Sequence, residues 1–151
     1  MYEPKPFWKG WYSHKFKAAG LRYEVAVSIQ NGDIVWINGP FPCGKWPDIK
    51  IFREDLIHEL EPGEKVEADR GYQGEPRCMT PQEGNDRAKT VHARHETANK
   101  RLKQWGCLKE LFRHDIRLHS TAFRAVAVIT QIAIEHGEPL FVVEYNNSNL
   151  V

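Results

Sequence analysis

The feature that most constrains the fold is a run of alternating side chains that ends in a turn dipeptide. From residue 21 to residue 30, apolar residues at the odd positions alternate with mostly polar residues at the even positions, which is the period of a half-buried strand. Asn31-Gly32 follows at once, and this pair tolerates positive φ at both central positions of a type I′ turn. The pattern predicts a hairpin in which residues 33–39 return beside 21–30, with residues 11–17 extending the same sheet.

Apolar residues at three- and four-residue spacing predict three helices. The first covers residues 47–60, because the fixed φ of Pro47 suits a first helical position. A short strand at 65–69 comes next, and the second helix covers 91–105 and stops at Gly106. Ser120 is predicted to cap the third helix, which is apolar on most of its surface over residues 122–133 and is therefore expected to be the most buried. This order predicts an α/β sandwich, a mixed sheet flanked by helices.

Composition excludes several classes of protein. A chain of 151 residues with 41% hydrophobic content predicts one domain over residues 1–151. The net charge of +1 gives no overall attraction to nucleic acid or membrane. Three cysteines without metal-ligand spacing argue against a disulfide framework and favour a reducing intracellular compartment, nuclear or cytoplasmic. No run approaches the roughly 20 apolar residues of a membrane span, so we expect no membrane partner.

Asp69 is the first candidate site residue. It closes the predicted strand at 65–69, and ligands of open α/β sheets gather at the carboxyl ends of strands. An ordinary alternative is that Asp69 caps the turn formed with Arg70-Gly71. The local sequence leaves both interpretations open.

Glu96 and Asp48 are the other candidate acids. On the predicted second helix, Lys100 lies four residues after Glu96. Glu96 is therefore either a metal ligand with cations nearby or one partner of a solvated ion pair. Asp48 lies just inside the start of the first helix, where interaction with the helix macrodipole already explains an acid.

Basic residues suggest a face for nucleic acid. Lys100, Arg101 and Lys103 follow Glu96 and would give that side of the domain a positive surface. A mixture of aromatic and basic residues between Phe7 and Arg22 could stack bases and neutralise phosphates, or could equally form an amphipathic sheet edge.

Several segments together resemble the DDE superfamily endonucleases, the catalytic domains of Harbinger-type transposases. The segments that carry the resemblance are KGWYSHKF, LRYEVAV, GPFPCGKWPDIKIFRE, EADRGYQG, ARHETANKRLKQWGCL and ITQIAIEHGEPLF. The resemblance implies an RNase H-like fold and a triad of two Asp and one Glu that holds two divalent ions, Mg or Mn, for cutting and joining DNA. It implies that Asp69 is the second Asp, Glu96 the Glu, and Asp48 an auxiliary metal ligand.

The same resemblance places the first Asp on a strand upstream of the segment matching Tyr2 to Tyr12. This sequence has no Asp before Asp33, which is predicted to lie in a hairpin turn and is a poor substitute. The expectation is therefore an N-terminally truncated domain that lacks the first strand. It would be either an impaired metal-dependent nuclease or an inactive domesticated remnant that binds DNA or assembles with other proteins. Oligomerisation and a separate DNA-binding partner protein stay open.

Overall fold

A hairpin forms the centre of the molecule. The computed structural model describes residues 6–15, 17–80 and 86–143. Within them, β3 (Leu21–Val27) pairs antiparallel with β4 (Ile34–Pro42). The other elements are η1 (Lys9–Trp11), β1 (Tyr12–Ser13), β2 (Ala18–Ala19), α1 (Asp48–Glu54), α2 (Leu56–Glu59), β5 (Val66–Glu67), η2 (Arg70–Tyr72), β6 (Cys78–Met79), α3 (Asp86–Lys103), α4 (Gly106–Lys109) and α5 (Arg117–Glu135). The predicted mixture of strands and helices is confirmed.

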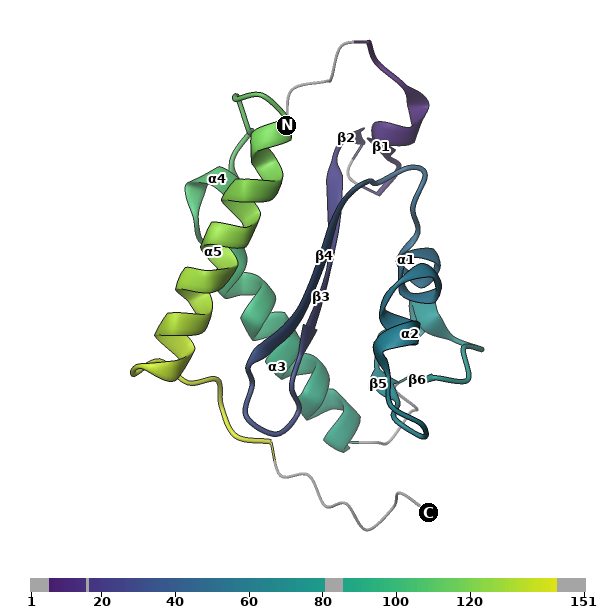
Figure 1. The fold of residues 1–151 in the computed structure, drawn as a ribbon, viewed down its shortest axis with the longest axis vertical. Helices are drawn as coiled ribbons and strands as arrows, with labels where there is room; N and C mark the ends of the chain where they lie inside the picture. The colour runs from purple at the N-terminus through teal and green to yellow at the C-terminus, as the bar shows by residue number, and fades with distance from the viewer. Residues whose placement is uncertain (1–5, 16, 81–85, 144–151) are drawn as a thin grey trace.

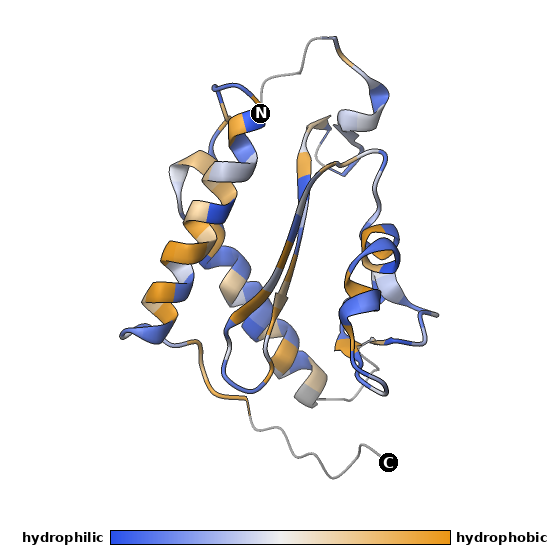
Figure 2. Cartoon of the chain, in the orientation of Figure 1, coloured by the Kyte–Doolittle hydropathy of each residue, from blue (hydrophilic) through white to orange (hydrophobic). Residues whose placement is uncertain are grey.

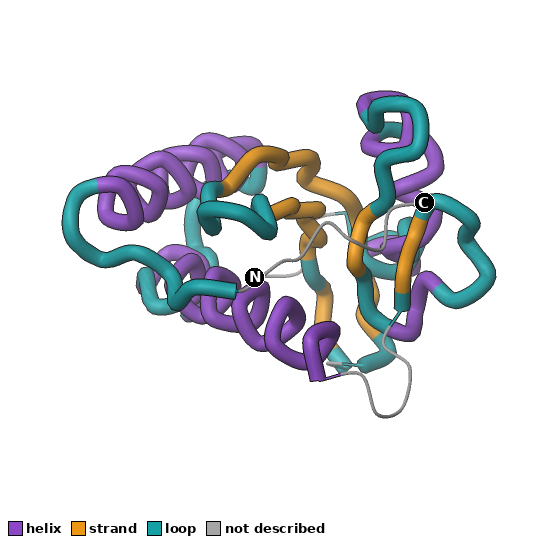
Figure 3. The backbone as a smooth tube through the Cα atoms, turned by 90° about the horizontal axis from the view of Figure 1, so that it is seen from below, coloured by secondary structure: helices purple, strands orange, loops and turns teal. Residues whose placement is uncertain are grey.

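The hairpin separates two groups of elements. Figures 1 and 3 show α3 and α5 on one side of it, and α1, α2, β5 and β6 on the other. In the described part of the chain the strands form three two-stranded sheets, of which β1–β2 and β3–β4 are antiparallel and β5–β6 is parallel. Among the same residues, no helix combines the length and apolar character needed to cross a bilayer.

The main core lies between the hairpin and the two long helices. Leu102 of α3 and Phe123, Val126 and Ala127 of α5 are buried together. Tyr23, Val25, Ile34 and Ile37 of the hairpin pack on this group. A lone two-stranded hairpin is marginally stable in water, so burial of this apolar face explains why the alternating segment holds its strand conformation.

A second, smaller core anchors the elements on the other side of the hairpin. Ile51 and Phe52 of α1 are both only 1% exposed. The Phe52 ring meets Tyr72 of η2 edge to face, with the ring centroids 5.9 Å apart. This contact joins α1 to the chain that follows β5.

The hairpin turn differs from the predicted type I′ geometry. Ser28 N donates to Asp33 O at 2.8 Å and Gly32 N donates to Ser28 O at 3.0 Å, so four residues form the loop. Gly32 has a φ of +84°, whereas Asn31 does not adopt a positive φ. Only glycine takes the left-handed conformation here, because a longer loop spreads the reversal over more residues. The prediction that residues 11–17 extend this sheet is also wrong, since β1 pairs with β2 in a sheet of its own.

The helices begin and end differently from the predicted bounds. Pro47 is the N-cap of α1 rather than its first residue, and the helix breaks at Asp55 before α2. Helix α3 ends at Lys103, and Gly106 opens α4 instead of terminating the longer helix. Ser120 lies inside α5, which already begins at Arg117.

Helix α5 was predicted to be the most buried helix, but it buries no more residues than the described part of α3 does. Its buried residues are Phe123, Val126, Ala127, Thr130 and Ile134. Four large apolar residues remain exposed, namely Leu118, Val128, Ile129 and Ile132. Figure 2 shows how much hydrophobic colour this helix carries in comparison with α3. Helix α5 therefore carries more apolar side chains than its one packed face buries.

We expect Phe52→Ala to lower the free energy of unfolding by about 3–5 kcal/mol, because it opens a cavity where the ring is fully enclosed. Urea denaturation followed by circular dichroism measures this change. Val35→Ala serves as the control, since Val35 is 62% exposed and its truncation should change the free energy by no more than about 0.5 kcal/mol. Equal effects of the two substitutions would contradict the placement of this core.

Candidate functional site

Polar side chains of the hairpin hold the elements that follow it. Arg22 Nε of β3 lies 2.9 Å from Asp48 Oδ1 at the start of α1. Asn38 Nδ2 of β4 donates to Asp55 Oδ2, between α1 and α2, at 2.7 Å. The hairpin thus presents apolar residues to α3 and α5, and charged or amide groups to α1 and α2.

Four carboxyl groups gather on this polar side and form what we call the acidic cluster: Glu24, Asp48, Asp55 and Asp69. Burial raises the pKa of Glu24, and the charges of Asp55 and Asp48 raise it further, against the hydrogen bond from Trp36. Partial burial also raises the pKa of Asp48, where Arg22 opposes the rise and Asp69 adds to it. These mutual effects show that the acids lie within electrostatic reach of one another.

Tyr72 lies within electrostatic reach of three members of the cluster. Burial raises the pKa of its phenol, and the negative charges of Asp48, Glu24 and Asp69 raise it further. A neutral phenol surrounded by carboxylates can donate its hydroxyl hydrogen but cannot offset their charge. Arg22 supplies a positive charge to the cluster through its ion pair with Asp48.

Asp69 follows β5 as predicted, and its side chain makes a local hydrogen bond. It is the N-cap of η2, and Oδ1 accepts from Gly71 N at 2.7 Å. This is the turn-capping role that the sequence offered as the ordinary alternative. The other carboxylate oxygen and the exposure of the residue leave room for a second role.

Glu96 lies in the middle of α3 and is exposed. Its Oε1 is 3.9 Å from Nε2 of His92, one turn earlier in the helix. His95, on the neighbouring position, instead faces the hairpin, with Nε2 3.3 Å from the carbonyl oxygen of Val25. The chain therefore directs His95 toward the core edge and leaves Glu96 on the solvent side of the helix.

The structure brings Asp48 and Asp69 together but does not group Glu96 with them. Across residues 6–15, 17–80 and 86–143, no set of three or more His, Cys, Asp or Glu side chains is arranged to hold a metal ion. The chemistry of the donors suits Mg or Mn, which prefer carboxylate oxygens. Their arrangement does not amount to a complete site, so the assignment of Asp48, Asp69 and Glu96 as metal ligands stays a prediction.

The three predicted DNA-binding residues have different surroundings. Lys100 and Lys103 are exposed at the end of α3. The Arg101 guanidinium donates to the carbonyl oxygens of Glu138 and Pro139, and the second of these bonds is 3.2 Å long. Arg101 therefore ties α3 to the chain after α5, which leaves the two lysines as the freer cations.

Besides Asp55, two residues that the sequence analysis passed over belong to this site. Glu24 sits in the polar half of the alternating strand, and its Oε2 accepts from Trp36 Nε1 at 2.8 Å. Arg22, two residues earlier, ion-pairs with Asp48. The alternation itself was the available signal, because it places both side chains on the face opposite the apolar one. Asp33 is held in the hairpin turn, where Oδ1 accepts from Gln131 Nε2 of α5 at 2.7 Å.

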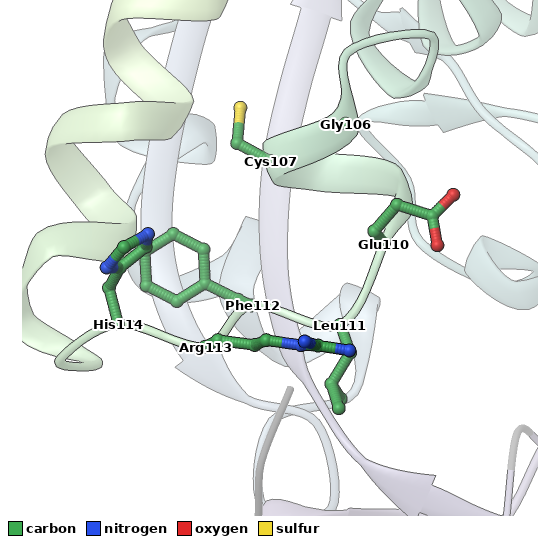
Figure 4. A pocket seen from close by; sticks show the side chains of 7 residues that line it. All are labelled: Gly106, Cys107, Glu110, Leu111, Phe112, Arg113 and His114. Carbon is green, nitrogen blue, oxygen red and sulfur yellow. The ribbon is translucent and has the colours of Figure 1, made fainter.

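One pocket lies away from the acidic cluster. It has a volume of 520 Å³ and is formed by α4 and the chain that follows it (Figure 4). Its lining residues are Gly106, Cys107, Glu110, Leu111, Phe112, Arg113 and His114. Because all of them come from one continuous segment, the pocket is a local concavity and adds no group to the acidic cluster.

Comparison with known proteins identifies one family. A family model described as DDE superfamily endonuclease matches residues 8–131, which include the acidic cluster, Glu96 and the end of α3. No curated protein and no solved structure matches the chain.

Glu24→Gln tests the electrostatic cost of the acidic cluster. The folded protein holds the pKa of Glu24 above its ordinary 4.5, so ionisation weakens folding as the pH rises from about 4.5 through the raised pKa. The amide keeps an acceptor for Trp36 and cannot ionise. We expect the variant to gain stability relative to the wild type between pH 4 and pH 7 in urea melts, and Glu110→Gln, an exposed control, to gain none. A constant difference across this range would contradict the cluster.

Proposed function

The chain belongs to the DDE superfamily endonucleases, and on that premise we propose that it acts on DNA as a single nuclease or transposase domain. The match over residues 8–131 is the observation that carries this proposal. The acidic cluster on the polar side of the hairpin supports it, because acids that hold cations at a phosphodiester are the common requirement of metal-dependent phosphoryl transfer.

We propose an RNase H-like arrangement of the Harbinger type. The motif order in the sequence supports the subtype. The fold is supported by the hairpin with long helices packed on one face, and by its outer strand edges, which are unpaired within the described residues. An unpaired edge of β3 offers backbone groups to a further strand, which is what a larger mixed sheet requires.

Asp69 and Glu96 are the proposed ligands of a divalent cation, Mg or Mn, with Asp48 as an auxiliary ligand. The charge of Asp69 raises the pKa of Asp48, whereas Glu96 lies beside His92 on the exposed face of α3. Three such ligands do not converge among the described residues. We expect weak cation binding and little or no DNA nicking by this chain alone.

Calorimetry with Mn²⁺ tests the cation ligands. Asp69→Ala and Glu96→Ala should each weaken binding by about tenfold or more, because each removes one of few anionic ligands. Glu110→Ala is the matched control, an exposed acid outside the acidic cluster that should leave the affinity unchanged. The same Mn²⁺ affinity in the wild type and both Ala variants would refute the site.

DNA binding is proposed to involve the positive end of α3. Lys100→Ala and Lys103→Ala should each lower the affinity for duplex DNA and reduce the slope of log affinity against log salt by about 1, as loss of one phosphate contact requires. Arg101→Ala should in addition lower the melting temperature, because Arg101 holds the carbonyls of residues 138 and 139. Lys65→Ala is the control, an exposed lysine that precedes β5. Unchanged salt slopes in both lysine variants would exclude this end of α3 from the interface.

The second candidate function is a catalytically inactive domain that binds DNA or assembles with other proteins. The lack of a three-ligand metal group among the described residues favours it. Incubation of supercoiled plasmid with the protein and Mn²⁺ separates the two functions. Robust metal-dependent cleavage would eliminate the inactive domain, and salt-sensitive binding without cleavage would support it.

A further inference from the structure

Two tryptophans and two lysines form a surface next to the acidic cluster, which we call the Trp–Lys platform: Trp8, Lys45, Trp46 and Lys50. Lys45 Nζ lies 5.7 Å from the centroid of the Trp8 ring and 5.8 Å from that of Trp46. Lys50 Nζ lies 4.2 Å from the Trp46 centroid. Aromatic rings attract cations that lie over their faces, so the rings and the lysine heads hold one another on the surface.

The backbone around Gly10 fixes the first half of the platform. A side-chain carbon added to Gly10 would lie 2.1 Å from Trp8 Cζ3, so the indole occupies the space that any other residue would fill. The carbonyl oxygen of Gly10 accepts from Gly44 N at 2.8 Å and from Lys45 N at 3.2 Å. Figure 1 shows η1 beside the loop between β4 and α1, which is the contact that these bonds make.

Arg22 fixes the second half and joins it to the acidic cluster. Its Nη1 donates to the carbonyl oxygen of Trp46, and its Nε pairs with Asp48. The Trp46 ring also packs on Phe41, with ring centroids 5.1 Å apart. One arginine therefore places a tryptophan of the platform and a candidate site acid at neighbouring positions.

We propose that the Trp–Lys platform binds single-stranded DNA and delivers it toward the acidic cluster, an inference that rests on the proposed action on DNA. The Trp8 side of the platform is open, since Trp8 is 48% exposed and Phe7 beside it is 49% exposed. Unpaired bases stack on such rings, whereas bases in a duplex already stack on one another. Lys45 and Lys50 supply the charges that neutralise the phosphates of the same strand.

The ion pairs on the platform do not cancel its positive charge. Lys50 lies 3.7 Å from Glu54 Oε1, and both side chains are more than two-fifths exposed. Exposed pairs of this kind are weak, so a phosphate can replace the carboxylate. Asp48, the member of the acidic cluster on the same helix as Lys50, is already paired with Arg22. Lys45 is therefore the cation best placed to bind a phosphate beside both rings.

Fluorescence anisotropy with a labelled oligothymidine of about a dozen nucleotides, a length within the range of known single-strand sites, tests the proposal. Trp8→Ala should weaken binding of this strand by about tenfold, which corresponds to the loss of one stacked base. Trp8→Phe should restore most of the loss, because it keeps an aromatic face. Lys45→Ala should reduce the salt slope by about 0.7, the value for one phosphate of a single strand.

A duplex of equal length and an unrelated aromatic provide the controls. Phe141→Ala removes an exposed ring that follows α5 and should leave single-strand binding unchanged. Trp8→Ala should affect duplex binding less than single-strand binding; equal losses on both would overturn the assignment to single strands. If the wild type binds duplex DNA, and if Trp8→Ala and Lys45→Ala bind oligothymidine as tightly as the wild type does, the proposed role of the platform alone is overturned. No binding of either DNA by the wild type would overturn the proposed function as well.

Discussion

The packing of the hairpin on the two long helices is the contact on which the rest of the structure depends. The rings of Tyr23 and Phe123 stack with centroids 3.7 Å apart, and the Tyr23 hydroxyl is 2.8 Å from His119 Nδ1. Two strands without helices would not bury enough apolar surface to offset the entropy lost in ordering them. Because α3 and α5 hold one face of the hairpin, the opposite face is free to carry polar and charged groups.

That division of faces explains how acids come to lie together in a small domain. Buried carboxylates repel one another, and here they lie on the polar side of β3, where Arg22 pairs with Asp48. Arg22 is also bonded to the Trp46 carbonyl, so the positions of Asp48 and of the Trp–Lys platform follow from one side chain.

The sequence predicted those features that depend on local periodicity and failed where tertiary contacts decide. The spacing of apolar residues predicted the hairpin, the helix that begins near residue 48 and the helix that contains residue 96. Strands and helices each impose a characteristic period on the side chains that face a core. The predicted type I′ turn of the hairpin was wrong, because Gly32 adopts a positive φ and Asn31 does not. The predicted burial of α5 was wrong for a different reason. Composition gives the number of apolar residues in a helix, but not how many of them pack against another element. The Asp69 cap was among the alternatives, whereas Glu24 was missed because its acidic neighbours are distant in sequence.

The proposed binding of a cation at the acidic cluster would be limited by Arg22, which pairs with Asp48. Burial and the charge of Asp69 disfavour ionised Asp48, and Arg22 offsets part of this cost. A cation that binds Asp48 would compete with the Arg22 guanidinium, whose Nε lies 2.9 Å from Asp48 Oδ1. The favourable free energy of that ion pair would be lost when the cation binds. The carboxylate of Asp69 instead accepts a hydrogen bond from the Gly71 amide. For the proposed cation site, this competition predicts that Asp69 contributes more to the affinity than Asp48, and that Arg22 sets the difference between them.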